Sequence, residues 1–555
     1  MLSRVPLFSV CCRDVRPCSP ARFRGCFGRP SMIQCWKVTF GKNSRKAVVH
    51  IMKSKRLKQV LLLMLGCGMA VTATGAEAEA IPVSLANASV NNGGVFEGWG
   101  TSLCWWANRL GYSDDLAQQA ADAFYGDGGL RLNIMRYNIG GGDDPSHHHI
   151  TRTDSAIPGW MVWDEAQQGF VYDYTADHNQ LNVLLRAVKA AGDNALVEVF
   201  SNSPPYFMTV SGCSSGGVNP GKNNLREDCY TDFAEYLVHV TDYIQRKLGV
   251  TVTSVSPMNE PNTDYWRYLS DKQEGCHVDA GEAQSRIIEE VAGALGRYGL
   301  DNVIIAASDE TSPDKQLKEW YAYSDRARAA IGRVNTHSYS EDGIAALGSL
   351  ARAQNLHLWM SEVDGDGTAG EHAGEMGAAL WMGRKIISDL NALSPSAWVM
   401  WQAIDNHISA QGMNGNRDSG MVDVNRGFWG VAVADHDRGD IVLTQKYYGL
   451  GQFTRYIRPG STLIHCGDSA VAAYDPAASE LVIVAVNTSA GEREVTFDLS
   501  SFAAVGGAAR VIRTSGSMAD GEHWASLADL PLSGKALTAA LRGNAITTFI
   551  ISGVE

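Results

Sequence analysis

The stretch Ser256-Pro257-Met258-Asn259-Glu260-Pro261 ends a short apolar run with a lone glutamate. A second stretch, Trp359-Met360-Ser361-Glu362-Val363-Asp364, does the same 102 residues later. Residues this far apart meet readily in a barrel of parallel strands, because the carboxyl ends of all its strands converge on one cleft. The two glutamates are therefore predicted to face each other across such a cleft.

Both stretches belong to a longer pattern in which short apolar runs alternate with helical segments. Alternation of this kind predicts an α/β fold, here a (β/α)8 TIM barrel. Three of the helical segments have clear ends: Asp114–Phe124 follows a Ser113 cap, Gln180–Ala191 stops at Gly192, and Asp232–Leu248 stops at Gly249. The eight runs are Val95–Gly100, Leu132–Tyr137, Ala195–Phe200, Thr253–Met258, Val303–Ala307, Arg333–His337, Leu356–Ser361 and Ala397–Trp401.

After about Lys446 the pattern changes to β-rich segments separated by Gly, Ser and Asp turns. This predicts a catalytic barrel over 77–445 and a C-terminal antiparallel, sandwich-like β side domain over 446–555. The extended segment Ile81–Val90, within 81–92, is expected to pair with that domain. The predicted strands of the side domain are Leu481–Asn487, Glu494–Leu499, Ala509–Arg513 and Ala545–Ile551.

The charge of the chain excludes two classes of partner. The formal net charge is −13, and 14 of the 47 Lys and Arg residues lie in the first 76 positions, which hold only one acidic residue. The remaining chain therefore carries 33 basic and 59 acidic side chains. Such an acidic body repels nucleic acid and anionic lipid, so a neutral substrate is expected. The oligomeric state is left open.

The N-terminus resembles a targeting sequence for export. Basic residues at 53–58 precede an apolar run at Val60–Leu65, and small residues follow near Ala76, which predicts a signal peptide over 52–76 and a secreted or periplasmic protein. The run is shorter than the ~20 residues that a spanning helix needs. An alternative is a cell-surface lipoprotein with a lipid anchor at Cys67. Since Met52 begins a well-formed signal, residues 1–51 are expected to be a non-native extension.

Five cysteines remain in the expected mature chain: Cys104, Cys213, Cys229, Cys276 and Cys466. An exported protein can keep disulfides, and Cys213 and Cys229 flank a Gly/Ser/Asn-rich loop that a bridge would stiffen. A Cys213–Cys229 disulfide is therefore predicted. The odd number leaves at least one free thiol.

Two opposed carboxyl groups are what cleavage of a glycosidic bond requires. One donates a proton to the leaving oxygen, and the other attacks or stabilises the anomeric carbon. Glu260 follows the fourth apolar run and Glu362 ends the seventh, and these strands face each other in an eight-stranded barrel. The pair predicts a glycoside hydrolase.

Aromatic side chains cluster just after the predicted strand ends, as expected for a cleft that stacks sugar rings. Arg136 ends the second run and can hold a carboxylate by a charge-assisted hydrogen bond, and His337 ends the sixth and could do the same. Each single aromatic residue could instead belong to the core. The aromatic residues are Trp99, Trp105, Trp106, Tyr206, Phe207, Tyr265, Trp266, Tyr339 and Trp401.

The triplet His147-His148-His149 invites a metal interpretation. Adjacent histidines on a loop cannot all face one ion, and Asp143-Asp144-Pro145 before them is typical of a turn. No metal and no organic cofactor are predicted.

Several of these motifs resemble glycoside hydrolase family 30, and most of all its endo-β-1,6-galactanases. The resemblance covers nearly all of 81–555. The matching segments are Gly98–Ala107, Arg136–Gly142, Asn202-Ser203-Pro204-Pro205-Tyr206-Phe207-Met208-Thr209, Asn259-Glu260-Pro261, Gln273–Cys276, Ser361–Gly367 and Lys446–Gly449.

The resemblance implies a retaining mechanism with Glu260 as acid/base and Glu362 as nucleophile. It implies that Asn259 holds the sugar 2-hydroxyl. The implied substrate-binding set is Asn259, Arg136, Trp105, Trp106, Asn202, Tyr206, His337, Tyr339 and Trp401.

The substrate implied by the resemblance is the β-1,6-galactan side chain of arabinogalactan. A β-1,6-glucanase or an exo-acting β-galactosidase of the same family would share both glutamates, and a non-catalytic carbohydrate-binding protein would share the cleft. Loops 143–175 and 408–440 are expected to decide between the substrates.

Overall fold

The computed structural model describes residues 80–365, 375–413 and 429–555. The predicted signal peptide, the extension 1–51 and Cys67 lie outside these ranges. No helix of the described residues combines the length and the hydropathy needed to cross a bilayer.

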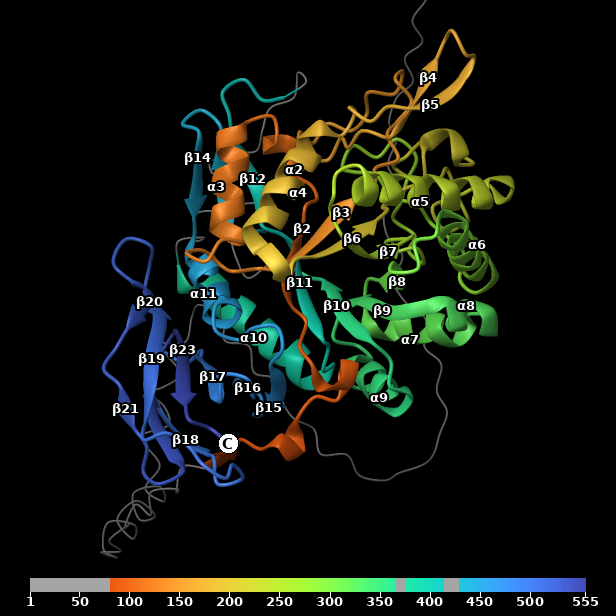
Figure 1. Ribbon diagram of the computed structural model, residues 1–555. Coiled ribbons are helices and arrows are strands. Elements are labelled where there is room, and N and C mark those ends of the chain that lie inside the picture. Colours follow the sequence, from red (N-terminus) through yellow and green to blue (C-terminus); the bar gives the residue numbers. More distant parts are fainter. Residues whose placement is uncertain (1–79, 366–374, 414–428) are drawn as a thin grey trace, which may run out of the picture. The chain divides into compact units, whose positions relative to one another are not determined.

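The centre of the fold is a closed barrel of eight parallel strands, in agreement with the predicted fold class (Figure 1). Each predicted run contributes one strand, and β11 pairs with β2 to close the ring. The strands in chain order are β2 (Gly98–Ser102), β3 (Ile134–Asn138), β6 (Leu196–Phe200), β7 (Val252–Ser256), β8 (Ile304–Glu310), β9 (Ile331–His337), β10 (Leu358–Glu362) and β11 (Ala397–Gln402).

The inside of the barrel is apolar at one end and charged above it. Ile134, Trp359, Ala397 and Val399 form a small buried cluster separate from the main core. Arg136 lies two positions after Ile134 in the same strand. Because alternate residues of a strand point to the same side, both side chains face the inside of the barrel. The strands therefore change from apolar to polar towards their carboxyl ends, where a barrel carries its site.

Helices surround the barrel and supply most of the apolar core. Ser113 Oγ accepts a hydrogen bond from the backbone of Leu116 at 3.3 Å, which caps α3 at the predicted position. The helices are α2 (Trp106–Leu110), α3 (Asp114–Phe124), α4 (His178–Ala191), α5 (Tyr230–Arg246), α6 (Glu282–Tyr298), α7 (Pro313–Ala322), α8 (Asp325–Ala330), α9 (Ile344–Gln354), α10 (Met376–Ala392) and α11 (Gln445–Thr454). Short 3-10 turns lie at η2 (Leu85–Asn87), η3 (Asn91–Gly94), η4 (Gly192–Asn194), η5 (Tyr206–Met208) and η6 (Glu227–Cys229).

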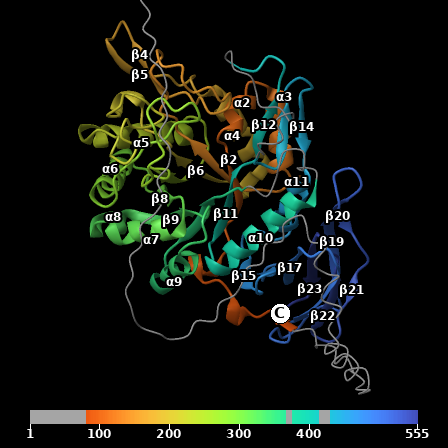
Figure 2. The ribbon, with the colours of Figure 1, turned by 180° about the vertical axis from the view of Figure 1, so that it is seen from behind.

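The C-terminal part is the predicted antiparallel β domain, built from a seven-stranded sheet and a three-stranded sheet over a core of their own. Strand β1 (Ala80–Pro82) pairs parallel to β18 in the smaller sheet. Helix α10 lies between the barrel and this domain in both views (Figures 1 and 2). The other strands are β15 (Thr462–His465), β16 (Ala470–Asp475), β17 (Glu480–Asn487), β18 (Arg493–Asp498), β19 (Ala508–Ser515), β20 (Glu522–Ser526), β21 (Leu530–Pro531), β22 (Ala536–Leu541) and β23 (Ala545–Ser552).

One small sheet lies within loop 143–175, and a second lies in and at both ends of loop 408–440. The hairpin of β4 (Met161–Asp164) and β5 (Gly169–Tyr172) follows β3. A three-stranded sheet of β12 (Ile404–Ile408), β13 (Ala432–Asp435) and β14 (Asp440–Leu443) follows β11. The sequence analysis did not predict these elements.

The predicted Cys213–Cys229 disulfide is wrong. All five cysteines of the described chain carry free thiols. The Cys213 sulfur faces His149 and Ser215, whereas the Cys229 sulfur faces Asp228 at the start of α5. The loop between them is held by hydrogen bonds instead, for example from the backbone of Ser211 to Asn224 at 3.2 Å.

Candidate active site

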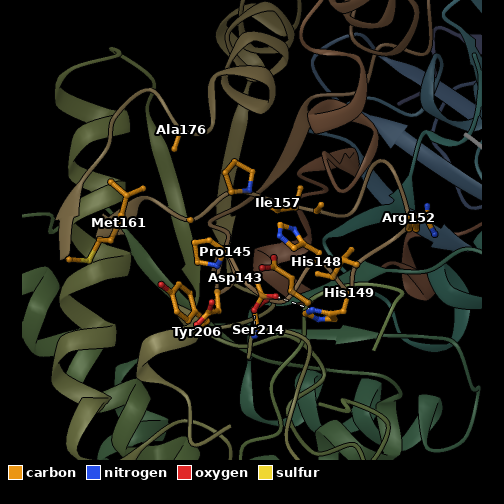
Figure 3. A pocket seen from close by; sticks show the side chains of 18 of the residues that line it. Asp143, Pro145, His148, His149, Arg152, Ile157, Met161, Ala176, Tyr206 and Ser214 are labelled. Carbon is orange, nitrogen blue, oxygen red and sulfur yellow. Dashed lines mark hydrogen bonds and ion pairs between the residues drawn. The ribbon is translucent and has the colours of Figure 1, made fainter. Parts of the chain in front are cut away.

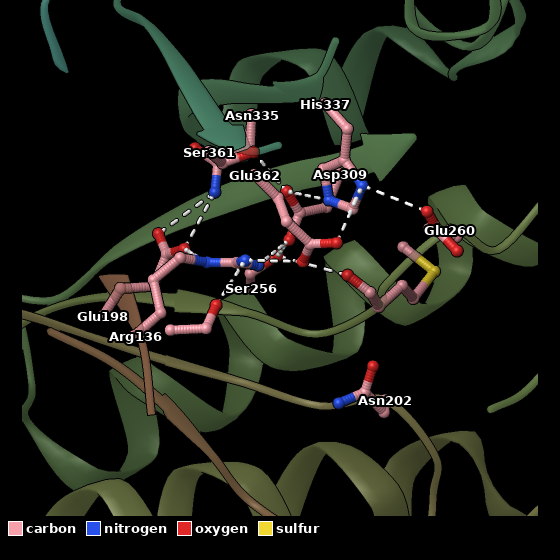
Figure 4. A network of polar contacts seen from close by, with 12 residues as sticks. Arg136, Glu198, Asn202, Ser256, Glu260, Asp309, Asn335, His337, Ser361 and Glu362 are labelled. Atoms are coloured by element: carbon pink, nitrogen blue, oxygen red, sulfur yellow. Dashed lines mark hydrogen bonds and ion pairs between the residues drawn. The ribbon is translucent and has the colours of Figure 1, made fainter. Parts of the chain in front are cut away.

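Glu260 and Glu362 meet at the carboxyl end of the barrel (Figure 4). Glu260 follows β7 and Glu362 ends β10. A carboxylate oxygen of each and a ring nitrogen of His337 all lie within 4.8 Å of one another. Both glutamates are buried, with 8% and 3% of their surface exposed. The structure therefore brings together two carboxyl groups that are far apart in the chain.

Three side chains hold the carboxylate of Glu362. Arg136 Nη1 donates to Oε2 at 3.0 Å, and Tyr339 Oη donates to Oε1 at 3.0 Å. His337 Nδ1 lies 3.5 Å from the same Oε1. Donors from β3 and from the carboxyl end of β9 fix the direction of this carboxylate and favour its charged form.

Glu260 is held differently. Tyr265 Oη donates to its Oε2, and His337 Nδ1 lies 3.2 Å from its Oε1. Its backbone has a φ of 47°, in the left-handed region that non-glycine residues rarely adopt. Trp266 Nε1 donates to the Glu260 carbonyl at 3.1 Å. A left-handed glutamate costs about 1–3 kcal/mol, and such costs are commonly found where a fold must aim a functional side chain.

Beneath the pair lies a buried network of charges centred on Arg136. Its Nε donates to Glu198 Oε1 at 3.0 Å, and its Nη2 pairs with Asp309. Glu198 also pairs with Arg333, and Asp309 lies 3.2 Å from His337 Nε2. Apart from the 2% exposure of Arg333, these side chains have no exposed surface. Every buried charge in the network thus has an opposite partner, as burial requires.

The protonation of the site follows from these contacts. Burial opposes a charge on His337, but Glu362 and Asp309 outweigh it and raise its pKa to about 10. Burial, with Glu260 and Asp309 nearby, raises the pKa of Glu362 to about 7 although His337 and Arg136 oppose the rise. Arg136 and His337 hold the pKa of Asp309 well below its usual range against the effect of burial.

The charges of the buried network balance if it holds one extra proton. Arg136, Arg333 and His337 supply three cations, and Glu198, Asp309, Glu260 and Glu362 supply four carboxyl groups. One proton shared by Glu260 and Glu362 balances the cluster. The pKa of Glu362, raised to about 7, marks the pH near which the cluster loses this proton.

Above the glutamates lies a cavity of about 850 Å³, here called the catalytic hollow. Tyr339 and Trp429 stack in its wall with ring centres 5.9 Å apart. Asn259 also lines it, and its buried Oδ1 has no hydrogen-bond partner among the described residues. The aromatic residues of the lining are Tyr265, Trp266, Tyr339, Trp401 and Trp429.

A second hollow of about 870 Å³ shares one lining residue, Arg152, with the first (Figure 3). Arg152 is neutralised by Asp154 at 2.5 Å and Asp405 at 2.6 Å. Tyr206 lines this second hollow. Both hollows fall in the size range of small-ligand sites, and together they offer room for more than one sugar ring.

Not all predicted substrate-binding residues lie at a hollow. Trp106 is a core residue: its Nε1 donates to Ser102 O at 2.9 Å and its ring packs on Phe124. Trp105 is fully buried behind Trp401, with ring centres 5.5 Å apart. Asn202 is buried and donates to Asn138 Oδ1 at 3.1 Å. Trp106 is therefore not placed to touch a substrate, because the chain turns into helix α2 at that residue.

The sequence analysis missed Asp309, Glu198 and Arg333. The predicted fifth run stopped at Ala307, but β8 continues to Glu310 and so includes Asp309. A signal was present, since Ser308-Asp309-Glu310 follows an apolar run just as Asn259-Glu260 does. Glu198 and Arg333 lie inside predicted strands, where charged residues are expected to face solvent unless paired.

Beyond Glu362, the chain is anchored by a buried ion pair. Lys446 pairs with Asp364, and the backbone of Gly430 donates to Asp364 Oδ2 at 2.7 Å. Lys446 belongs to α11, so the side-domain end of the fold braces the strand that carries Glu362.

Comparisons with known proteins find similarity to glycoside hydrolases. A family model described as O-glycosyl hydrolase family 30 matches residues 85–318. An endo-β-1,6-galactanase of Hypocrea rufa is 30% identical over 484 residues, which cover 84% of this chain and 93% of that protein. An exo-β-1,6-galactobiohydrolase of Bifidobacterium longum subsp. longum is 30% identical over 463 residues, which cover 66% of this chain and 30% of that protein.

Among solved structures, a family 30 subfamily 8 xylanase from Clostridium acetobutylicum superposes with a TM-score of 0.60 at 18% identity. The match covers 85% of this chain and 100% of that structure. At this identity the likeness concerns the fold.

We expect Asp309→Asn to destabilise the protein. The substitution keeps the shape but removes one carboxylate from a neutral buried cluster, so Arg136 and His337 lose a counter-charge. Breaking a buried pair costs about 3–5 kcal/mol. Urea unfolding should show a lower midpoint. The exposed Asp264→Asn serves as the control and should change the unfolding free energy by less than about 0.5 kcal/mol. Equal midpoints for the two variants would contradict the charge count.

Proposed function

The chain belongs to glycoside hydrolase family 30, and from that membership and its site we propose that it is a retaining hydrolase of β-1,6-linked galactan that cuts within the chain. One observation carries the mechanism: carboxylate oxygens of Glu260 and Glu362 lie within 4.8 Å of each other. Retaining glycosidases have carboxyl groups ~5–5.5 Å apart, whereas inverting ones need ~6.5–9.5 Å to admit a water. The short separation supports retention.

In the first step, Glu362 attacks the anomeric carbon while Glu260 donates its proton to the departing glycosidic oxygen. The bond between sugar and aglycone breaks, and an ester forms between the sugar and Glu362. In the second step, the Glu260 carboxylate takes a proton from water, whose oxygen attacks the same carbon. The ester breaks, Glu362 is restored as a carboxylate, and Glu260 is again protonated.

The buried network suits these two reaction steps because the total charge of Glu260 and Glu362 stays the same. Before the first step the glutamates hold one proton and one negative charge between them. After it, Glu362 is an uncharged ester and Glu260 is the anion, so the pair again carries one negative charge. Arg136 and His337 therefore face the same total charge in both states. Pre-arranged charges of this kind stabilise a reaction without reorganising.

Similarity supports the choice of substrate. Both curated relatives carry names of enzymes that act on β-1,6-linked galactose, each at 30% identity. The aromatic lining of the catalytic hollow suits the apolar faces of a sugar. The two hollows that meet at Arg152 favour a substrate of several sugars and so an endo-acting enzyme.

The test of substrate is product analysis on β-1,6-galactan, β-1,6-glucan and glucuronoxylan side by side. A ladder of short oligosaccharides from galactan alone is the expected result. Release of a disaccharide or monosaccharide alone would identify an exo-acting enzyme. Cleavage of another glycan would keep the mechanism but replace the substrate, and no cleavage at all would indicate a carbohydrate-binding protein.

Glu260→Gln and Glu362→Gln should each reduce turnover of galactan. Loss of general acid–base catalysis costs about 10²–10⁴-fold, and loss of the nucleophile should cost at least as much. Glu494→Gln, on the exposed face of β18, is the matched control and should retain full activity. Wild-type turnover in either active-site variant would remove that residue from the mechanism.

We expect kcat/KM to fall as the pH rises through about 7. Burial raises the pKa of Glu362 to about 7, so the cluster keeps its extra proton below that pH and loses it above. Two ionised carboxylates leave no acid for the departing oxygen. A pH profile of initial rates measures this. A kcat/KM that rises steadily to pH 9 would show that loss of a proton near pH 7 does not limit the reaction.

A further inference from the structure

Away from the glutamates, four potential metal-binding side chains meet at the rim of the second hollow. Asp143, His147 and His149 come from the loop after β3, and Cys213 comes from the loop after β6. One ligand atom of each lies within 4.8 Å of those of the others. We call this set the loop cluster.

The backbone at His148 explains how two histidines of the triplet can share one site. The sequence analysis rejected a metal because adjacent histidines cannot all face one ion. His148 has a φ of 45°, in the left-handed region. His147 and His149 lie on either side of this turn in the chain, and both reach Asp143. The triplet thus supplies two ligands instead of three, which removes the objection.

The separations within the loop cluster suit a tetrahedral ion. His147 Nδ1 lies 3.4 Å from Asp143 Oδ1, and His149 Nε2 lies 3.6 Å from Cys213 Sγ. Zinc–nitrogen and zinc–oxygen distances of ~2.0 Å and a zinc–sulfur distance of ~2.3 Å give tetrahedral edges of about 3.3–3.6 Å. These two spacings match such edges, and the ligand atoms of all four residues lie within 4.8 Å of one another.

The donors and their surroundings favour the same ion. A thiolate and two imidazoles select zinc over magnesium or calcium, which prefer oxygen ligands. Cys213 is fully buried and free of any disulfide. His149 Nδ1 is buried and lies 3.0 Å from Asp143 Oδ2, without a hydrogen bond of good geometry among the described residues.

We propose that Asp143, His147, His149 and Cys213 form a structural zinc site. Four protein ligands leave no open position for chemistry, which is the pattern of structural sites. Ser215 Oγ lies 3.2 Å from Cys213 Sγ, close enough for its hydroxyl to orient the sulfur. The ion would tie the loop after β3 to the loop after β6.

This tie would shape the substrate cleft. Asp143, His149 and Ser214 line the second hollow and lie close together in its wall (Figure 3). The backbone of Ser214 donates to Asp143 Oδ1 at 3.2 Å, so the two loops already meet there. Zinc would fix the wall of the hollow that we assign to the more distant sugars, while leaving the glutamates untouched.

The test uses full-length protein without a histidine tag, because a tag binds metal by itself. After dialysis against metal-free buffer and one addition of Zn²⁺, elemental analysis should find one zinc per chain. Cys213→Ser and His147→Ala should lose it. His148→Asn is the matched control, since asparagine tolerates the left-handed backbone and His148 is not a ligand; it should keep the metal.

Two further measurements distinguish the loss of a metal ligand from the loss of the fold. Added Zn²⁺ should raise the thermal unfolding midpoint of the wild type and of His148→Asn but not of Cys213→Ser, because a ligand stabilises only the state that binds it. Cobalt should give a thiolate charge-transfer band that Cys213→Ser lacks. Absence of stoichiometric zinc in the wild type, or wild-type binding by folded Cys213→Ser, would overturn the proposal.

Discussion

The ion pairs of Arg136 are the interaction on which the site depends. This side chain has no exposed surface and joins Glu198, Asp309 and Glu362, which come from three other strands of the barrel. A buried arginine is tolerated only when its charge is matched, so the carboxylates around it cannot be changed singly. The same contacts aim the carboxylate of Glu362 at the cleft. Stability and catalysis thus rest on one buried cluster, which closes the barrel above its apolar layer.

The cluster also sets the charge that the reaction can use. Three cations face four carboxyl groups, which leaves room for one proton on the pair of Glu260 and Glu362. The reaction moves the negative charge from one glutamate to the other without changing the total. The left-handed backbone of Glu260 and its contacts with Tyr265 and His337 keep the second carboxyl group within reach of the first. The site is therefore arranged before any sugar enters.

Much of this could be predicted from the sequence. All eight predicted runs became strands, and several of them, such as Val303–Ala307 and Ala397–Trp401, are the continuous apolar segments typical of buried parallel strands. Glu260 and Glu362 stood out since each ends such a run. Asp309 was missed because the run before it was ended too early, and the role of Glu198 and Arg333 depends on pairing across the barrel, which no local pattern reports. The predicted Cys213–Cys229 disulfide was wrong for a similar reason, because the spacing of two cysteines around a loop does not fix the direction in which each sulfur points. The backbone turn at His148 is equally invisible to residue spacing.

The most direct test of the account is to trap the covalent intermediate. A 2-deoxy-2-fluoro glycosyl fluoride built on β-1,6-galactobiose should react with the enzyme and then hydrolyse slowly, because fluorine beside the reacting carbon disfavours the positively charged transition state. The mass of the intact protein should rise by one glycosyl unit, and peptide mapping should place the label on Glu362. A label on Glu260, or on any other residue, would contradict the assignment of the nucleophile and the charge balance built on it.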